Sequence, residues 1–263
     1  MYTQELVDLF EYALQGAKAA QSVILQYYKS DIRVEHKSDD SPVTKADKEA
    51  DRLIRKALVQ THLPIISEEH EVPGYADRKN FERYWLVDPL DGTKDFIREN
   101  DEFTINIALI EDGFPLFGLL LVPVSSELYV GGKEFPSLKY VGPLHALNFE
   151  EVLLHGEKLP LQSTSEPTLL GSRSSHFSEL ITLAKKELNC EQIKFQALGS
   201  SLKLAWLAEG KADIYIRKSP AMEWDIAAGQ AIVEGAKKQV NDFSGNRVSY
   251  NKESLLSTWF IAR

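Results

Sequence analysis

Apolar residues recur every three or four positions between residues 6 and 27, which predicts a long amphipathic helix. The stretch 29–42 that follows is polar. Thr44 and Asp47 then stand at the spacing of a capping box, a pattern with which helices often begin. A second helix is therefore predicted from there to just before Pro64, with one apolar stripe formed by Ala50, Leu53, Ile54, Ala57 and Leu58.

Short apolar runs typical of strands come next, and the first two stop at acidic residues. Residues 63–66 lead into Ser67-Glu68-Glu69, and residues 84–87 lead into Asp88. The following region is rich in β-forming residues, with strands predicted at 103–110, 116–122 and 128–130 and a hairpin turn at 111–113. The pattern over 133–162 mixes strand and loop features.

The chain changes character at the polar stretch 163–167, where we expect a boundary between two lobes. Beyond it, strands are predicted at 168–170, 193–198, 212–216, 238–240 and 258–262, and helices at 176–188, 200–209 and 222–234. Such alternation is typical of an α/β unit. The predicted fold class is therefore α/β, with an α+β first lobe (1–162) and an α/β second lobe (163–263).

Composition and charge narrow the function. The 263 residues are 43% hydrophobic, enough for a packed core, and 39 acidic against 30 basic residues give a net charge of −9. This charge disfavours a nucleic-acid polymer as partner. The single cysteine, Cys190, excludes an internal disulfide and favours an intracellular protein. The longest apolar stretch, 114–124, is too short to span a bilayer, and residues 1–10 lack the basic start of a signal peptide, so we expect a cytoplasmic protein.

The segment from Trp85 to Phe96 carries the strongest chemical signal. Asp88 stands where a buried strand ends, and Asp91 follows three residues later, before a Gly-Thr pair at which a helix can begin. Two carboxylates on one tight turn repel each other and need a counter-charge. Mg²⁺ can supply this counter-charge, and it prefers carboxylate and carbonyl oxygens as ligands. No Cys/His cluster in the sequence favours a softer metal. Backbone N–H groups at 92–94 suit a phosphate oxygen.

Each of these acids also has an ordinary structural interpretation. Asp-Pro and Asp-Gly pairs often form turns, as at Asp88 and Asp91. Asp225 can be an acid that favours the start of a helix, and Asp47 a capping residue. Glu68 ends an apolar run, however, and strand ends of this kind gather at one edge of a sheet and make a site.

Four motifs in this order resemble those of the inositol monophosphatase superfamily of metal-dependent, lithium-sensitive phosphatases. They are Ser41-Pro-Val-Thr44-Lys-Ala-Asp47, Ser67-Glu68-Glu69, the segment 85–96, and Glu223-Trp224-Asp225, and the resemblance covers essentially the whole chain. Asp91-Gly-Thr-Lys94-Asp95-Phe96 is similar to the form found in the CysQ branch, the 3'(2'),5'-bisphosphate nucleotidases. Inositol phosphatases usually have Asn where Asp95 stands.

The resemblance implies a layered αβαβα sandwich and a role for each motif residue. Two or three Mg²⁺ ions would be held by Glu68, Asp88, the carbonyl of Leu90, Asp91 and Asp225, with Asp88 bridging two of them. Asp47 and Thr93 would orient and deprotonate a metal-activated water, which attacks phosphorus in line. The residues implied to bind substrate are Glu68, Asp91, Gly92, Thr93, Lys94, Ser172, Gly199, Lys203 and Asp225.

The implied substrate is adenosine 3',5'-bisphosphate, hydrolysed to AMP and phosphate. The same resemblance extends to 3'-phosphoadenylyl sulfate and a place in sulfur metabolism. The segment 199–203 matches the branch's G-S-x-x-K, whose amides and Lys203 would take the remaining phosphate. The segment 172–176 matches [ST]-R-S-H apart from one inserted serine, which places His176 one residue late.

Two other functions stay open from the sequence. One is an inositol monophosphatase or a broad sugar-phosphate phosphatase, against which Lys94-Asp95 and the segment 199–203 count. The other is a non-catalytic metal-binding protein of the same fold, against which the intact acids, Asp47 and Thr93 count. We expect a monomer in the cytoplasm, and by resemblance to some relatives a peripheral place at the inner membrane's cytoplasmic face is an alternative.

Overall fold

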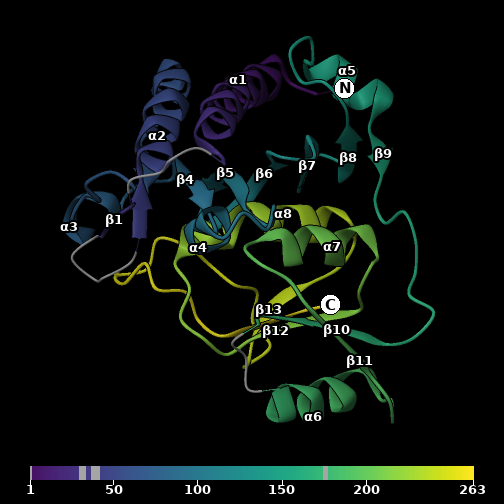
Figure 1. Cartoon of the computed structure of the whole chain (residues 1–263). Helices are drawn as coiled ribbons and strands as arrows, with labels where there is room; N and C mark the ends of the chain where they lie inside the picture. Colours follow the sequence, from purple (N-terminus) through teal and green to yellow (C-terminus); the bar gives the residue numbers. More distant parts are fainter. Residues whose placement is uncertain (1, 30–33, 37–41, 174–176) are drawn as a thin grey trace.

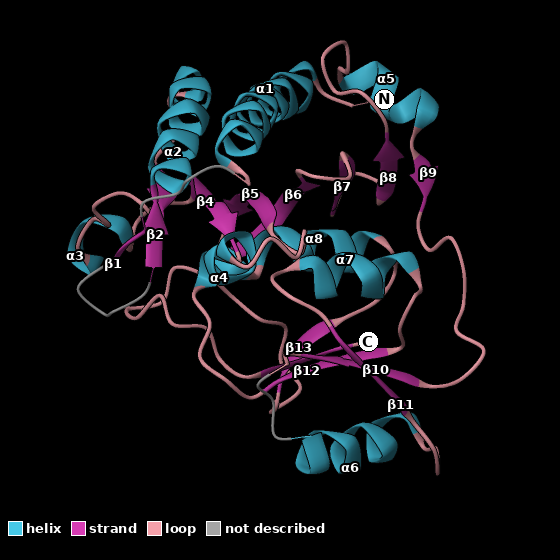
Figure 2. Ribbon diagram, in the orientation of Figure 1, coloured by secondary structure: helices cyan, strands magenta, loops and turns pink. Residues whose placement is uncertain are grey.

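The computed structural model describes residues 2–29, 34–36, 42–173 and 177–263. Five layers lie one above another (Figures 1 and 2): helices α1 and α2, a seven-stranded sheet, helices α7 and α8, a five-stranded sheet, and helix α6. This arrangement confirms the predicted α/β class and the αβαβα order of layers.

The two predicted N-terminal helices form the first layer. Helix α1 spans Gln4–Tyr27 and α2 spans Lys45–Leu58, and the capping box at the start of α2 is present. The helices cross closely at Gly16, where a Cβ atom would lie 3.2 Å from the Cα of Ile54. Their apolar faces share one core with the upper face of the large sheet.

The seven-stranded sheet contains every strand predicted in the first lobe. Its order is β3-β4-β5-β6-β7-β8-β9, and β3 and β4 are parallel whereas the other neighbours are antiparallel. The strands are Ile65–Ser67, Arg83–Asp91, Thr104–Glu111, Phe114–Val122, Glu127–Gly132, Leu138–Val141 and Glu157–Lys158. The mixed region 133–162 thus supplies β8, β9 and the helix α5, Phe149–His155.

Four short elements lie beside these layers. Strands β1 (Val34–His36) and β2 (Pro42–Thr44) pair with each other; β1 lies within the polar stretch 29–42, and β2 leads from its end to Thr44. Helix α3 spans Tyr75–Arg78, and α4 spans Thr93–Ile97 directly after β4.

The five-stranded sheet has the order β11-β10-β12-β14-β13, parallel at β11, β10 and β12 and antiparallel at β14 and β13. Its strands are Thr168–Gly171 (β10), Lys194–Ala197 (β11), Ile214–Arg217 (β12), Val240–Asp242 (β13) and Phe260–Ala262 (β14). Helices α6 (Phe177–Leu188) and α7 (Leu202–Glu209) agree with the pattern. The large sheet ends at Lys158 and this one starts at Thr168, while the division into two lobes near 163 stays a prediction.

The helix predicted over 222–234 is wrong in one respect. A 3-10 turn, Glu223–Asp225, comes first, and α8 spans only Ala227–Gly235. The carboxylate of Asp225 accepts a hydrogen bond from the Met222 amide at 3.0 Å, and the amide of Asp225 donates to the Met222 carbonyl. These bonds close the tight turn, so Asp225 lies before α8 and not in its first turn.

Helix α8 packs unusually closely on the large sheet. A Cβ atom at Gly118 of β6 would lie 2.3 Å from the carbonyl oxygen of Ala228, so only glycine fits there. The small residues predicted to allow close packing do so. The core between the two sheets includes α7 and α8 and is continuous. None of the helices in the described ranges is long and apolar enough to cross a membrane.

Replacing Gly118 by Ala should destabilise the fold, because the added methyl group would collide with the backbone of α8. We expect a loss of about 1–3 kcal/mol in the free energy of unfolding, measured by urea titration. The matched control is Gly74→Ala, whose Cβ would meet only a carboxylate oxygen of Asp77 at 3.6 Å. An equal effect of both substitutions would contradict the close packing.

Candidate active site

An irregularity in strand β4 separates the two acids of the central motif. Asp88 pairs with Asn106 of β5 and Asp91 pairs with Thr104, so β4 has one more residue than β5 over this stretch. A bulge of this kind bends a strand and redirects its side chains. Pro89 is tolerated here because a bulge leaves one residue without a ladder hydrogen bond.

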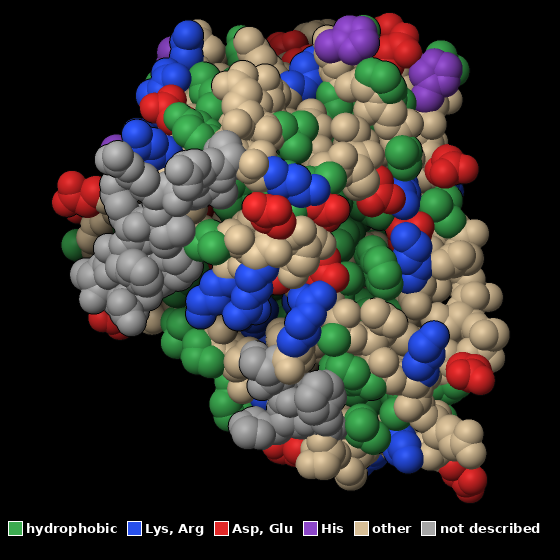
Figure 3. All heavy atoms as spheres, in the orientation of Figure 1, with side chains coloured by type: hydrophobic (Ala, Val, Ile, Leu, Met, Phe, Trp, Pro, Cys, Tyr) green, Lys and Arg blue, Asp and Glu red, His purple; other side chains and the backbone are tan. Residues whose placement is uncertain are grey.

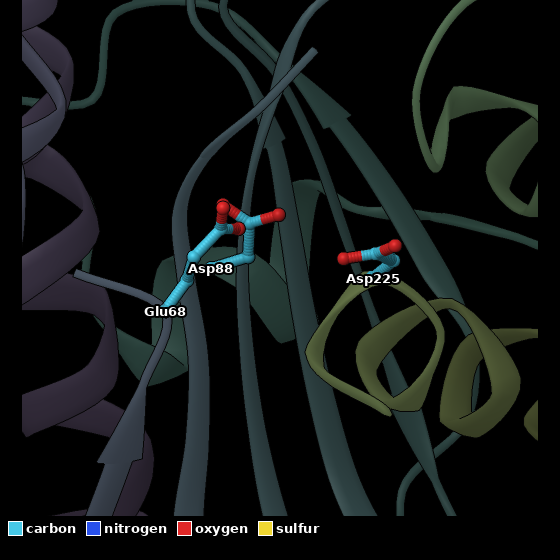
Figure 4. Close-up of side chains that lie close together, drawn as sticks. All are labelled: Glu68, Asp88 and Asp225. Atoms are coloured by element: carbon cyan, nitrogen blue, oxygen red, sulfur yellow. The ribbon is translucent and has the colours of Figure 1, made fainter. Parts of the chain in front are cut away.

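Three acids from three separate elements come together. Glu68 follows β3, Asp88 lies on β4 and Asp225 closes the 3-10 turn, and one ligand oxygen of each lies within 4.8 Å of the others. Figure 4 shows Glu68 and Asp88 side by side, with Asp225 facing them from the other side. The indole N–H of Trp224 donates to Glu68 Oε2 at 3.0 Å, which joins the first and third of these elements.

Asp91 is held from the second half of the chain. One of its carboxylate oxygens accepts a hydrogen bond from the amide of Ser201, and the hydroxyl of Ser201 is within 2.8 Å of Asn106 on β5. Asp91 also lines the cavity described below. The segment 199–203 thus positions a predicted metal ligand, in addition to the nucleotide contact expected from its sequence.

The electrostatics of the cluster favour a cation. Burial, together with the charges of Glu68, Asp91 and Asp225, raises the pKa of Asp88 well above its usual range. Burial and the charge of Asp91 raise the pKa of Asp225 to about 8, although Arg217 opposes this. Buried like charges that repel one another are stabilised by a bound metal ion.

Asp47 and Thr93 form the hydrogen-bonded pair that the resemblance implies. Thr93 donates from Oγ1 to Asp47 Oδ1 at 3.0 Å, while Asp47 Oδ2 accepts from the amide of Thr44 at 2.8 Å. The capping function and the contact with Thr93 therefore use different oxygens of one carboxylate. Burial raises the pKa of Asp47, and the hydrogen bonds from Thr44 and Thr93 oppose this effect.

A cavity of about 760 Å³ opens above the acids and is lined from both halves of the chain. Gly92 lines it with φ +97°, a left-handed conformation that favours glycine, before α4 begins. On the face seen in Figure 3, basic and acidic side chains lie next to one another near α4. Every residue predicted for the metal or the substrate lines this cavity: Glu68, Asp88, Leu90, Asp91, Gly92, Thr93, Lys94, Ser172, Gly199, Lys203 and Asp225.

The residues predicted to contact the nucleotide differ in how many of their hydrogen-bond donors are already used within the protein. Lys203 is 2% exposed, and its ammonium donates to the carbonyls of Leu198 and Ser200 at 3.0 and 2.6 Å. An ammonium has three donors, so these two bonds leave one, and Nζ also lies 5.6 Å from the centroid of the Tyr215 ring. The amide of Gly199 donates to Glu102 at 2.6 Å and is already used. Ser174, Ser175 and His176 lie outside the described residues.

Several cavity residues were not assigned to the site from the sequence. Arg217 lines the cavity at the end of β12. Arg173 also lines it and forms an ion pair with Glu102 at 2.6 Å. Trp224 was noted only as part of a motif. The position of Arg217 directly after a predicted strand is a signal that the sequence contains. The contact of Trp224 with Glu68 has no such signal, because only the tertiary structure brings these two residues together.

The layered sandwich and its carboxylate cluster define an α/β protein suited to hold a hard divalent cation. The model of the inositol monophosphatase family matches residues 5–259. The 3'(2'),5'-bisphosphate nucleotidase CysQ of Salmonella typhimurium is 36% identical over 96% of this chain and 98% of its own. The crystal structure of CysQ from Bacteroides thetaiotaomicron aligns with a TM-score of 0.86 and 36% identity over 96% of this chain and 95% of its own.

A more distant neighbour is an inositol monophosphatase from Zymomonas mobilis, with a TM-score of 0.73 and 26% identity over 99% of this chain and 94% of its own. The chain belongs to the inositol monophosphatase family, a family of phosphatases. The resemblance drawn from the four motifs is confirmed.

The metal-free protein should lose stability as the pH rises. The pKa of Asp225 is about 8 in the folded protein, and that of an aspartate in an unfolded chain is about 3.9. Between these values the folded state binds more protons, so the stabilisation is complete at low pH and is lost as the pH passes through about 8. Melting temperatures in EDTA between about pH 5.5 and pH 9 measure this.

Two controls accompany the pH series. Asp225→Asn should reduce the slope, because the amide does not titrate. Added Mg²⁺ should raise the melting temperature most at high pH, where the carboxylates are charged. A melting temperature of the metal-free protein that increases from pH 6 to pH 8 would contradict the electrostatic description of the cluster.

Proposed function

We propose that this protein is a Mg²⁺-dependent phosphatase that removes the 3'-phosphate of adenosine 3',5'-bisphosphate, giving AMP and phosphate. The observation that carries the proposal is one cavity lined by the carboxylates of Glu68, Asp88 and Asp225 and by Thr93, whose hydroxyl donates to the buried carboxylate of Asp47. The nucleotide as substrate is supported by the name of the relative from Salmonella typhimurium, which is 36% identical over 96% of this chain.

The donor set fits a hard cation. Glu68, Asp88, Asp91 and Asp225 offer carboxylate oxygens and Leu90 a carbonyl, the ligand types that Mg²⁺ prefers. When bound, Mg²⁺ supplies positive charge that stabilises the phosphoryl oxygens and acidifies water at the site. The proposal includes two or three such ions, which Glu68, Asp88, Asp91 and Asp225 and the carbonyl of Leu90 would hold.

The Asp47–Thr93 pair is placed to move a proton. Because Thr93 donates its own hydroxyl proton to Asp47, the lone pairs of its Oγ1 are available to accept a proton from water. As the water oxygen bonds to phosphorus, the bond from phosphorus to the ribose 3'-oxygen breaks. The water proton passes through Thr93 to Asp47, whose pKa is raised by burial and which is therefore the better base. The leaving ribose oxygen takes a proton from solvent water, and Asp47 afterwards gives its proton up to solvent.

The second half of the chain would bind the rest of the nucleotide. Lys203 keeps one donor, Ser172 lines the cavity, and Arg217 adds a guanidinium near Asp225. These groups suit the phosphate that is not cleaved. Hydrolysis of 3'-phosphoadenylyl sulfate by the same site, and a monomeric enzyme in the cytoplasm, stay predictions.

The first test is phosphate release in Mg²⁺, comparing adenosine 3',5'-bisphosphate with myo-inositol 1-phosphate, each with and without Li⁺. We expect a large preference for the nucleotide in kcat/KM and inhibition by Li⁺. A preference for the inositol phosphate would keep the metal site and would show that the substrate assignment is wrong. Absence of release from either substrate would overturn the proposed function.

Asp47→Asn should lower kcat by about 10²- to 10⁴-fold, because the amide cannot accept the proton. An Asn oxygen can still accept the capping bond from Thr44, so the helix should persist. The measurement is kcat at saturating Mg²⁺, with the melting temperature as a check on folding. Glu49→Gln, on the exposed side of the same helix, is the matched control and should keep full activity. A fully active Asp47→Asn variant would refute the proton transfer.

A further inference from the structure

Helix α2 carries a second buried carboxylate that the proposed mechanism does not use. Asp51 is 5% exposed and lies one helical turn after Asp47. Its Oδ1 accepts a hydrogen bond from the hydroxyl of Ser67 at 2.5 Å, and Ser67 is itself 2% exposed. Because Ser67 is the residue directly before Glu68, this bond acts on the backbone that presents a candidate metal ligand.

The same face of α2 makes a second contact, from Arg55 to His70 in the turn that follows Glu68. Nη1 of Arg55 lies 2.8 Å from Nδ1 of His70 and 3.8 Å from Oδ2 of Asp51. Arginine only donates, so the imidazole nitrogen accepts this bond. Asp51 and Arg55 thus connect α2 to the residues on both sides of Glu68.

We propose that Asp51 is a positioning residue for the metal centre: through Ser67 it fixes the backbone from which the Glu68 carboxylate reaches the cation. The inference rests on the proposed function, because it assigns Glu68 to a metal. Removing a group that holds a metal ligand in place typically weakens the binding of the metal by about 10- to 100-fold.

Asp47 and Asp51 lie one turn apart on helix α2 and contact two different parts of the site. Four residues of α-helix rise about 6 Å, and residues four apart lie on the same side of a helix. Asp47 holds Thr93, and Asp51 holds the chain at Glu68. A single rigid helix therefore sets the distance between the proton acceptor and one metal ligand.

The experiment measures Mg²⁺ binding to the metal-free full-length protein by calorimetry, without substrate. Asp51→Ala should weaken Mg²⁺ binding about tenfold or more. Asp51→Asn keeps an oxygen that accepts from Ser67 and should restore most of the affinity. Glu49→Gln on the same helix should bind Mg²⁺ like the unsubstituted protein. Melting temperatures of the metal-free variants report their folding separately.

Ser67→Ala removes the other partner of the bond and provides an independent test if Asp51→Ala does not fold. It should weaken Mg²⁺ binding to a similar extent, and the double variant should bind no more weakly than the weaker single one, because both remove one interaction.

Two results would overturn the inference. One is an Mg²⁺ affinity unchanged in Asp51→Ala and Ser67→Ala while the melting temperature falls, which would make the pair purely structural. The other is an Asp51→Asn variant as weak as Asp51→Ala. If the unsubstituted protein binds no Mg²⁺, the metal centre of the proposed function is itself wrong, and the inference falls with it.

Discussion

The repulsion among carboxylates that are buried in one cavity is the constraint on which the rest of this structure depends. Burial and mutual charge raise the pKa values of Asp88 and Asp225, so in the absence of a cation the cluster opposes its own ionisation. A fold keeps such an arrangement only if surrounding contacts hold the acids in place. Hydrogen bonds from both halves of the chain hold Glu68, Asp91 and Asp225 in this structure.

These contacts join the large sheet to the middle helical layer. Trp224, which precedes α8, donates to Glu68 after β3, and the amide of Ser201 before α7 donates to Asp91 at the end of β4. The positions of α7 and α8 are in turn set by close packing, since α8 lies against Gly118 of the large sheet. The packing of the middle helical layer therefore also determines the geometry of the acids. A shift of α8 along the sheet would move Asp225 and loosen Glu68 together.

Local patterns predicted most of the helices and strands, whereas the predicted metal and substrate residues and the order of layers came from the resemblance of four motifs to a known family. The periodicity of α1 and α2, the capping box at Thr44 and the acids at strand ends are all contained within a few neighbouring residues. The 3-10 turn at Asp225 was missed because a carboxylate bonded to its own backbone competes with a regular helix. The contact of Asp51 with Ser67 spans 16 residues and has no sequence signal, since Asp51 reads as one more polar position of an amphipathic helix.

Asp47 shows why a local signal and a chemical function can coincide in one residue. A carboxylate has two oxygens, and here one completes the capping box with Thr44 while the other accepts from Thr93. The cap is thus more than a competing interpretation of the motif, because it fixes the direction in which the second oxygen points. The N-terminus of α2 also has a positive partial charge that favours the ionised form of Asp47, against the effect of burial. The requirement to begin a helix and the requirement to hold a base are met by the same geometry, and for that reason a common capping pattern can carry a specific chemical function.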